Sequence, residues 1–160
     1  MDFSRLKRTE VVGMLSGALL AVSLFLPWYS LSRSPDRVVQ QAWVCGAGNY
    51  SCSAWQTFPI NRWLFLAAAV APFILTYFVL SAQRGQYPTG EFTMTVGLAV
   101  IVLVAFNGVI AKPGSDFQFG LSLDYGFYVA LLAGFVMAGA GAMVSLESGG
   151  GAQRKPPATF

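Results

Sequence analysis

The sequence predicts an all-α fold, a four-helix transmembrane bundle with a small disulfide-stapled extracellular cap. Hydrophobic residues make up 55% of the 160 residues and charged residues only 11%, whereas about a quarter of a soluble domain is charged. Four segments without charged side chains each have the length of about 20 residues that crosses about 30 Å of hydrocarbon. These segments are 11–31, 63–82, 92–111 and 125–146. They define one membrane domain, residues 1–147.

The first apolar segment, 11–31, follows three basic residues, as the apolar core of a secretory signal peptide would. A signal peptide has a shorter apolar core, which ends in a small-x-small cleavage motif. Here the apolar run continues to Trp28, and no such motif precedes the polar residues. We therefore expect this segment to stay in the protein as the first transmembrane helix.

The longest connection, 32–62, contains both cysteines of the chain, Cys45 and Cys52. An even number of cysteines in an oxidising compartment predicts a disulfide, with Cα atoms about 4.4–6.8 Å apart. Thiol redox chemistry is the alternative, but it usually needs a CxxC pair and a second pair to pass electrons on. A structural disulfide is favoured. The aromatic residues that border the connection are typical of an interfacial belt: Trp28, Tyr29, Trp55, Phe58 and Trp63.

The second and third segments each carry one unusual residue. Pro72 lies in the middle of 63–82, where it removes a backbone hydrogen bond and should kink the helix. Asn107 lies near the end of 92–111 and is the most polar side chain in any segment. An amide there predicts a hydrogen bond between helices, or else the lining of a ligand path. Pro72 and Asn107 together mark a possible ligand groove.

Small residues recur on one face of the fourth segment, 125–146, and of the first. In lipid, small residues let helix backbones approach closely. The residues are Gly126, Ala130, Gly134, Ala138 and Ala142 in the fourth segment, and Gly13, Gly17 and Ala21 in the first. We expect these two faces to pack against each other; a helix from another protein is the alternative occupant.

The distribution of basic residues predicts the orientation in the membrane. Four spans place six basic residues on the side of the amino terminus and four on the other side. Because basic residues are enriched in cytoplasmic segments, both termini are expected in the cytoplasm and the chain in the plasma membrane. The cysteines then lie outside, where disulfides persist. The stretch 148–160, rich in glycine and proline, is expected to be a disordered cytoplasmic tail.

Three short motifs carry a resemblance to a known group of proteins. LPWYS at 26–30 and SAWQTF at 53–58 flank the first connection, and LDYG at 123–126 leads into the fourth segment. In these features the chain resembles a group of uncharacterised four-span membrane proteins of actinobacteria, which implies a location in the cell envelope and no particular activity. WVC at 43–45 followed by Cys52 is similar in layout to claudin-type proteins, but the Gly-Leu-Trp element is missing and the cysteines are closer together.

The composition argues against most catalytic functions. The chain has no histidine, so it lacks the commonest ligand for metal or haem and the commonest acid–base group. The basic residues form no stripe that would bind nucleic acid. We expect a non-enzymatic chain without cofactor or metal, an accessory or scaffold subunit of a larger cell-envelope or respiratory complex, in contact with membrane lipid and other subunits. A small transporter or lipid-binding protein is the alternative.

Overall fold

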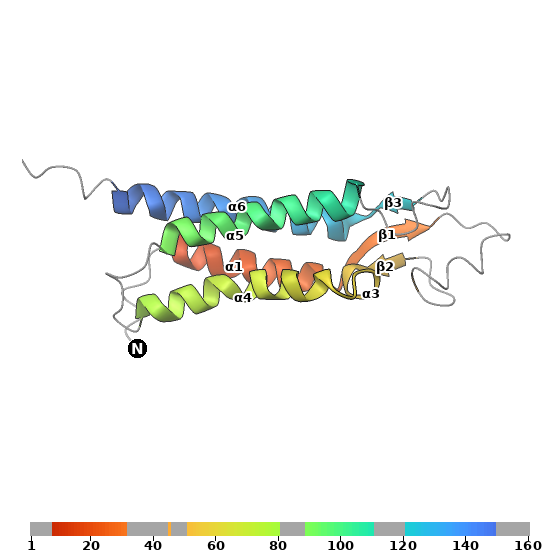
Figure 1. Ribbon diagram of the computed structural model, residues 1–160, viewed down its shortest axis with the longest axis horizontal. Helices are drawn as coiled ribbons and strands as arrows, with labels where there is room; N and C mark the ends of the chain where they lie inside the picture. Colours follow the sequence, from red (N-terminus) through yellow and green to blue (C-terminus); the bar gives the residue numbers. More distant parts are fainter. Residues whose placement is uncertain (1–7, 32–44, 46–50, 81–88, 111–120, 150–160) are drawn as a thin grey trace, which may run out of the picture.

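The computed structural model describes residues 8–31, 45, 51–80, 89–110 and 121–149 (Figure 1). Four long helices run side by side, and a small sheet lies at one end, which we call the sheet end. The elements in chain order are α1 (Arg8–Ser23), β1 (Pro27–Leu31), β2 (Ser51–Ser53), α3 (Ala54–Thr57), α4 (Asn61–Leu80), α5 (Thr89–Ala105), the π-helical turn η3 (Phe106–Ile110), β3 (Leu121–Leu123) and α6 (Tyr125–Gly149).

Three helical stretches are long and apolar enough to cross a membrane: Asn61–Phe78, Gly90–Ile110 and Tyr125–Glu147. This is consistent with a multi-pass membrane protein. Helix α1 has 16 residues and is shorter than the usual span of about 20 residues. Within the described residues, three of the four predicted spans therefore coincide with helices that are long and apolar enough to cross a membrane.

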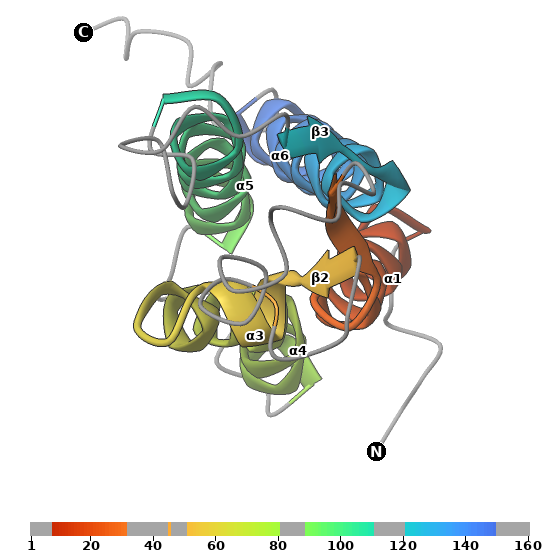
Figure 2. The same cartoon turned by 90° about the vertical axis from the view of Figure 1, so that its right-hand side faces the viewer.

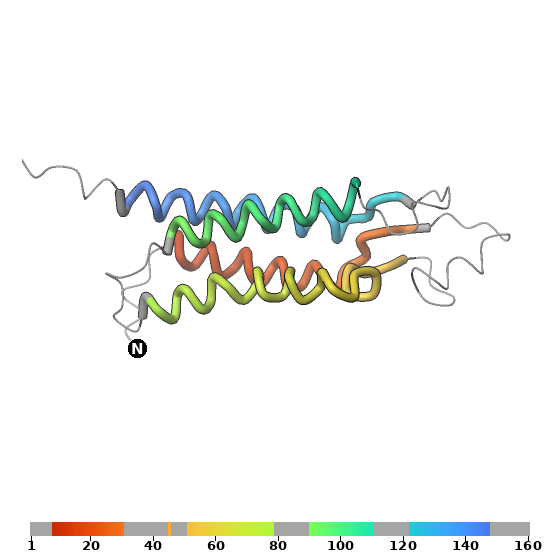
Figure 3. The backbone as a smooth tube through the Cα atoms, in the orientation of Figure 1, coloured from red at the N-terminus to blue at the C-terminus, as the bar shows by residue number. Residues whose placement is uncertain are grey.

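The first helix ends at Ser23 and not near residue 31, so the prediction for 11–31 is wrong in its last third. The backbone N–H groups of Phe25 and Leu26 bond to carbonyl groups three residues earlier, at 3.1 and 3.2 Å, which tightens the last turn. Pro27 then has no N–H and disfavours a helical conformation at the preceding residue. Figure 3 shows the chain leaving the helix axis there and entering β1.

The sheet corrects the prediction of a purely α-helical fold. Its three strands are antiparallel in the order β2-β1-β3. Tyr29 in β1 is the partner of Cys52 in β2 and of Leu123 in β3. The end of the first predicted span therefore forms the central strand, and segments from two different connections pair with it.

At the carboxyl end, α6 continues to Gly149. The first two residues of the predicted tail, 148–160, are therefore helical. Residues 150–160 lie outside the described residues.

The four helices form a ring in which α6 lies between α5 and α1, and α1 lies between α6 and α4 (Figure 2). Their inward faces form one apolar core with the sheet end. Its largest fully buried side chains include Leu20, Trp28, Phe65, Val104 and Met137. Large apolar side chains such as Leu15, Val102 and Leu132 are exposed on the outside of the ring, as expected for helices that face lipid.

Helix α6 packs most closely against α5, whereas the sequence predicted that its small residues face the first helix. A Cβ atom added to Gly134 would lie 3.0 Å from Ile101 Cγ1, and one added to Gly97 would lie 2.7 Å from the Cα atom of Ala138. Gly141 approaches the backbone of Met94 in the same way. The close approach is therefore between α5 and α6.

The small residues of α1 also face a helix other than the predicted one. A Cβ atom on Gly17 would meet Pro72 Cγ at 2.8 Å, and one on Gly13 would lie 3.9 Å from Pro72 Cβ. Both positions thus face α4. Helix α1 does lie beside α6, and Gly126 of α6 meets Leu26, Pro27 and Trp28 of the predicted first segment. Gly13 and Gly17, however, face α4 and not the small residues of α6.

Candidate functional site at the sheet end

Trp28 is at the centre of the sheet end. Its side chain is fully buried, and the rings of Phe58, Phe65 and Phe127 lie edge-on to it with centroids 5.9, 5.6 and 6.1 Å away. Its indole N–H donates a hydrogen bond of 2.8 Å to the carbonyl oxygen of Ser23 at the end of α1. One side chain on β1 thus contacts residues before α4, within α4 and within α6, and the core of the sheet end is continuous with that of the helices.

A buried polar network crosses the same region. The Asn107 side chain, 4% exposed, accepts a hydrogen bond of 2.7 Å from the Asn61 amide and donates one of 2.8 Å to the Leu103 carbonyl. The Tyr29 hydroxyl donates to the Asn107 carbonyl at 2.8 Å. The network joins β1, α4 and η3, and it contains the interhelical hydrogen bond that the sequence predicted for Asn107.

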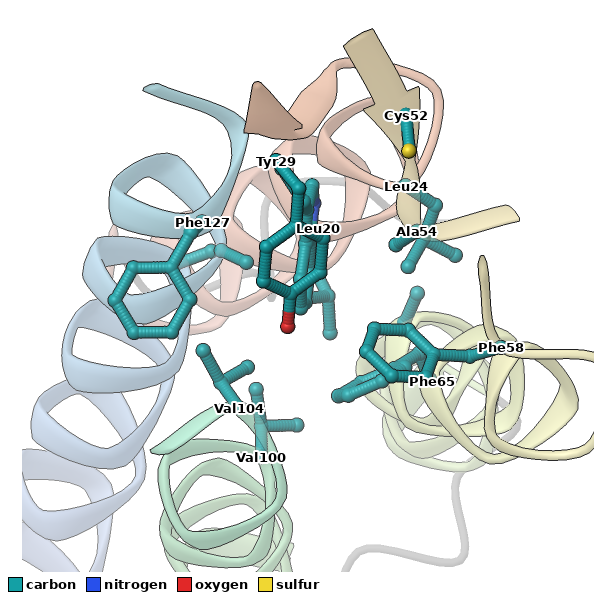
Figure 4. Packing of buried hydrophobic residues seen from close by; sticks show 14 of the residues in the cluster. Leu20, Leu24, Tyr29, Cys52, Ala54, Phe58, Phe65, Val100, Val104 and Phe127 are labelled. Atoms are coloured by element: carbon teal, nitrogen blue, oxygen red, sulfur yellow. The ribbon is translucent and has the colours of Figure 1, made fainter. Parts of the chain in front are cut away.

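The Tyr29 hydroxyl stays protonated in this network. Burial raises the pKa of its hydroxyl well above the ordinary value of 10.0, because the ionised form would lose its hydration. The hydroxyl therefore remains a hydrogen-bond donor. Figure 4 shows the side chains of Tyr29, Phe65, Val104 and Phe127 converging from four different elements.

The Cys45–Cys52 disulfide confirms the prediction for the two cysteines. The two Cα atoms are 4.9 Å apart, within the predicted range. Both residues are buried, and Cys52 packs in the same apolar cluster as Trp28 and Tyr29. The disulfide is therefore part of the core at the sheet end.

We expect the Asn61–Asn107 hydrogen bond to contribute measurable coupling energy. Asn61→Ala and Asn107→Ala should each lower the free energy of unfolding by about 1–2 kcal/mol, because each leaves a polar partner unpaired. The double variant should cost about 0.5–1.5 kcal/mol less than the sum of the two, the range found for such pairs between membrane helices. Unfolding of the four proteins in mixed detergent micelles measures this coupling. Strict additivity would contradict the assignment.

The two residues of the predicted ligand groove, Pro72 and Asn107, lie apart along the bundle. Asn61, the hydrogen-bond partner of Asn107, lies in the same helix as Pro72. Pro72 comes 11 residues later in α4 and is therefore about 16 Å further along the helix axis. A cavity of about 20 Å³ lies beside Pro72 and is lined by all four long helices, including Thr9, Thr76 and Thr93. This volume is that of about one water molecule.

The predicted aromatic belt divides into buried and exposed members. Trp28, Tyr29 and Phe58 are core residues, whereas Trp63 is 56% exposed and Trp55 is half-buried. Arg62, which the sequence pattern did not mark as a site residue, has its guanidinium over the rings of both Trp55 and Trp63. The sequence signal for this contact is the pair Arg62-Trp63, which begins seven residues after Trp55.

Within the described residues, no group of three His, Cys, Asp or Glu side chains could hold a metal ion. Comparison with protein-family models, with curated proteins and with solved structures gives no match for this chain.

Proposed function

We propose that this chain is a non-catalytic accessory or scaffold subunit that presents its sheet end as a cap to a larger complex in the plasma membrane. The observation that carries the proposal is the shared core of cap and helices. Trp28 and the Tyr29–Asn107–Asn61 network join the sheet end to α4, η3 and α6, and the disulfide closes the connection that contains β2. A surface held in this way loses little conformational entropy when a partner binds.

The proposal includes a fourth span formed by α1. Its 16 residues extend about 24 Å, and they lie in the ring between α4 and α6. Leu15 and Val22 on this helix are 65% and 56% exposed. Exposed apolar side chains on a helix flanked by membrane-spanning helices support a lipid-facing position for α1.

We further propose that the sheet end lies outside the cytoplasm and both termini lie inside. Ser122→Cys, at an exposed position of β3, should react with a membrane-impermeant maleimide in intact cells, because disulfides persist in the outer compartment. Glu147→Cys, near the opposite end of α6, should react only after lysis. The reverse pattern would overturn this orientation.

The test of the accessory function is copurification from native membranes in a mild detergent, with quantitative mass spectrometry. The wild-type chain should recover a defined set of membrane proteins. Ser51→Arg places a bulky cation at an exposed position of β2 and should reduce that recovery at least about fivefold, since a mismatched charge in an interface costs more than 1 kcal/mol. Arg8→Gln at the opposite end is the control and should retain it. Recovery of the wild-type chain as a lone monomer would overturn the proposal.

The alternative function is a small transporter or lipid-binding protein. The structure gives this alternative less support, because the possible groove residues Pro72 and Asn107 lie in different regions of the bundle. The cavity beside Pro72 has about 20 Å³, whereas ligand pockets usually have a few hundred.

A further inference from the structure

A cluster of aromatic side chains surrounds one arginine on the outside of the sheet end. We call Phe25, Trp55, Ile60, Arg62 and Trp63 the aromatic–arginine patch. The Arg62 guanidinium lies 5.1 Å from the ring centroid of Trp55 and 5.6 Å from that of Trp63. Phe25 stacks on Trp55 at 5.3 Å, and Trp55 contacts Trp63 edge-on at 5.8 Å. The two indole rings therefore hold the guanidinium in place.

The positive charge of Arg62 is poorly compensated by the described residues. Arg62 is the second residue of α4, and the first turn of this helix has no acidic residue. Its charge therefore adds to the positive end of the helix dipole, an arrangement that is unfavourable without an anion. A guanidinium has five N–H donors. Here Nη1 makes one long bond of 3.4 Å to the Trp55 carbonyl, and Nε is buried without a hydrogen-bond partner in the described part of the chain.

The surroundings of Arg62 are apolar and exposed. Phe25, Ile60 and Trp63 are 63%, 76% and 56% exposed. Arg62 itself is at the start of the stretch Asn61–Phe78, which is apolar enough to cross a membrane. When α4 spans the bilayer, the guanidinium lies at the level of the lipid headgroups and the exposed aromatic rings lie beside the acyl chains. A free anion would complement the charge alone, whereas a phospholipid complements both the charge and the apolar surface.

We propose that the aromatic–arginine patch binds the phosphodiester headgroup of an anionic phospholipid through Arg62, with an acyl chain of that lipid along Trp63 and the neighbouring Leu64, which is 51% exposed. Guanidinium groups suit phosphate oxygens because their planar N–H groups can form charge-assisted hydrogen bonds to them. The cation–π contacts hold the Arg62 side chain in position before the lipid binds, which reduces the entropy lost on binding. This site does not depend on whether the chain has partner subunits.

The test is native mass spectrometry of the full chain in a mild detergent, titrated with dioleoyl phosphatidylglycerol or with dioleoyl phosphatidylcholine. The wild-type protein should bind phosphatidylglycerol roughly tenfold more tightly than phosphatidylcholine, because both lipids have a phosphodiester but the choline ammonium offsets its negative charge in phosphatidylcholine. Arg62→Gln should remove this preference. Arg62→Lys keeps the positive charge but removes the planar guanidinium, and it should retain about a third of the affinity for phosphatidylglycerol. Arg8→Gln, an exposed arginine at the opposite end of the bundle, is the matched control and should bind as the wild type does.

Three results would overturn the proposal. The first is equal affinity of the wild-type protein for the two lipids. The second is an Arg62→Gln variant that keeps the preference for phosphatidylglycerol, or an Arg8→Gln variant that loses it. The third is complete displacement of phosphatidylglycerol by millimolar inorganic phosphate, which would show a site for a free anion.

Discussion

Replacing Trp28 with alanine is expected to lower the free energy of unfolding by about 3–5 kcal/mol, the cost of truncating a buried aromatic side chain. The indole is fully buried and touches aromatic residues before α4, within α4 and in α6. Its removal leaves a cavity at the junction of the sheet and the bundle. It also leaves the Ser23 carbonyl without the N–H donor of the indole.

Phe135→Ala is the control for this variant. Phe135 is a large aromatic residue on α6, but it is 57% exposed, so its truncation should cost less than about 1 kcal/mol. Unfolding in mixed detergent micelles, followed by far-ultraviolet circular dichroism, measures both variants. Equal losses for Trp28→Ala and Phe135→Ala would show that the sheet end is not part of the bundle core. The same experiment in the presence of reductant shows how much of the remaining stability depends on the disulfide.

The sequence was sufficient to predict three apolar spans and the disulfide, because both leave signals that need no tertiary information. The spans appear as long stretches without charge, and two cysteines have one possible intramolecular pairing. The start of α6 at Tyr125 was predicted to the residue. The second span was predicted at 63–82, and α4 begins two residues earlier, at Asn61.

The sheet could not be predicted from the apolar pattern. Residues 27–31 continue the uncharged stretch of the helix before them, and it is the pairing of Tyr29 with Cys52 and Leu123 that makes this segment a strand. That pairing joins parts of the chain far apart in sequence. Pro27 was the local signal for the end of α1, since a proline disfavours helix at the residue before it. The burial of Trp28 and Tyr29 likewise depends on this pairing, which is why they were assigned to an interfacial belt.

The spacing of the small residues explains why the sequence did not indicate α5 as the helix that packs most closely against α6. A helix has 3.6 residues per turn, so residues repeated every four positions move gradually around its surface. Residues spaced alternately by four and three positions stay on one face. On α6 the positions that meet α5 are Gly134, Ala138, Gly141 and Ser145. The predicted stripe shares the first two and then continues to Ala142, which is half-buried, while Gly141 is buried.

Helix α5 has the same spacing, which gives the register of the pair. Gly90 meets Ser145, Met94 meets Gly141, Gly97 meets Ala138 and Ile101 meets Gly134. As residue numbers rise on α5 they fall on α6, so the helices are antiparallel. Small residues that repeat at this seven-residue interval on both helices were the signal in the sequence for the interface.

The register predicts the order of effects of three glycine substitutions. Gly97→Leu should lower the free energy of unfolding by about 3 kcal/mol, at the upper end of the range for overpacking, because the added Cβ meets the backbone of Ala138, which cannot rotate away. Gly134→Leu should cost less, about 1–2 kcal/mol, since its nearest neighbours are the side-chain atoms Ile101 Cγ1 and Val100 Cγ1, at 3.0 and 3.1 Å. Gly139→Leu is the control, because nothing lies within 4 Å of a Cβ atom there, and it should be neutral or slightly stabilising.

A compensating substitution distinguishes two explanations for a loss of stability in Gly134→Leu: contact with α5 in this register, or a general intolerance of large side chains in α6. Ile101→Ala removes the side chain that lies closest to Gly134, so it should recover most of the stability that Gly134→Leu loses. It should recover none of the loss from Gly97→Leu, one turn away on the same seam. In double-mutant cycles the coupling between Ile101→Ala and Gly134→Leu should therefore be favourable and about 1 kcal/mol, while the coupling with Gly97→Leu should be near zero. If both cycles give the same coupling, or if Gly139→Leu destabilises the protein as much as Gly97→Leu, α5 and α6 do not meet in this register, and the small residues of α6 remain available to a helix from another subunit.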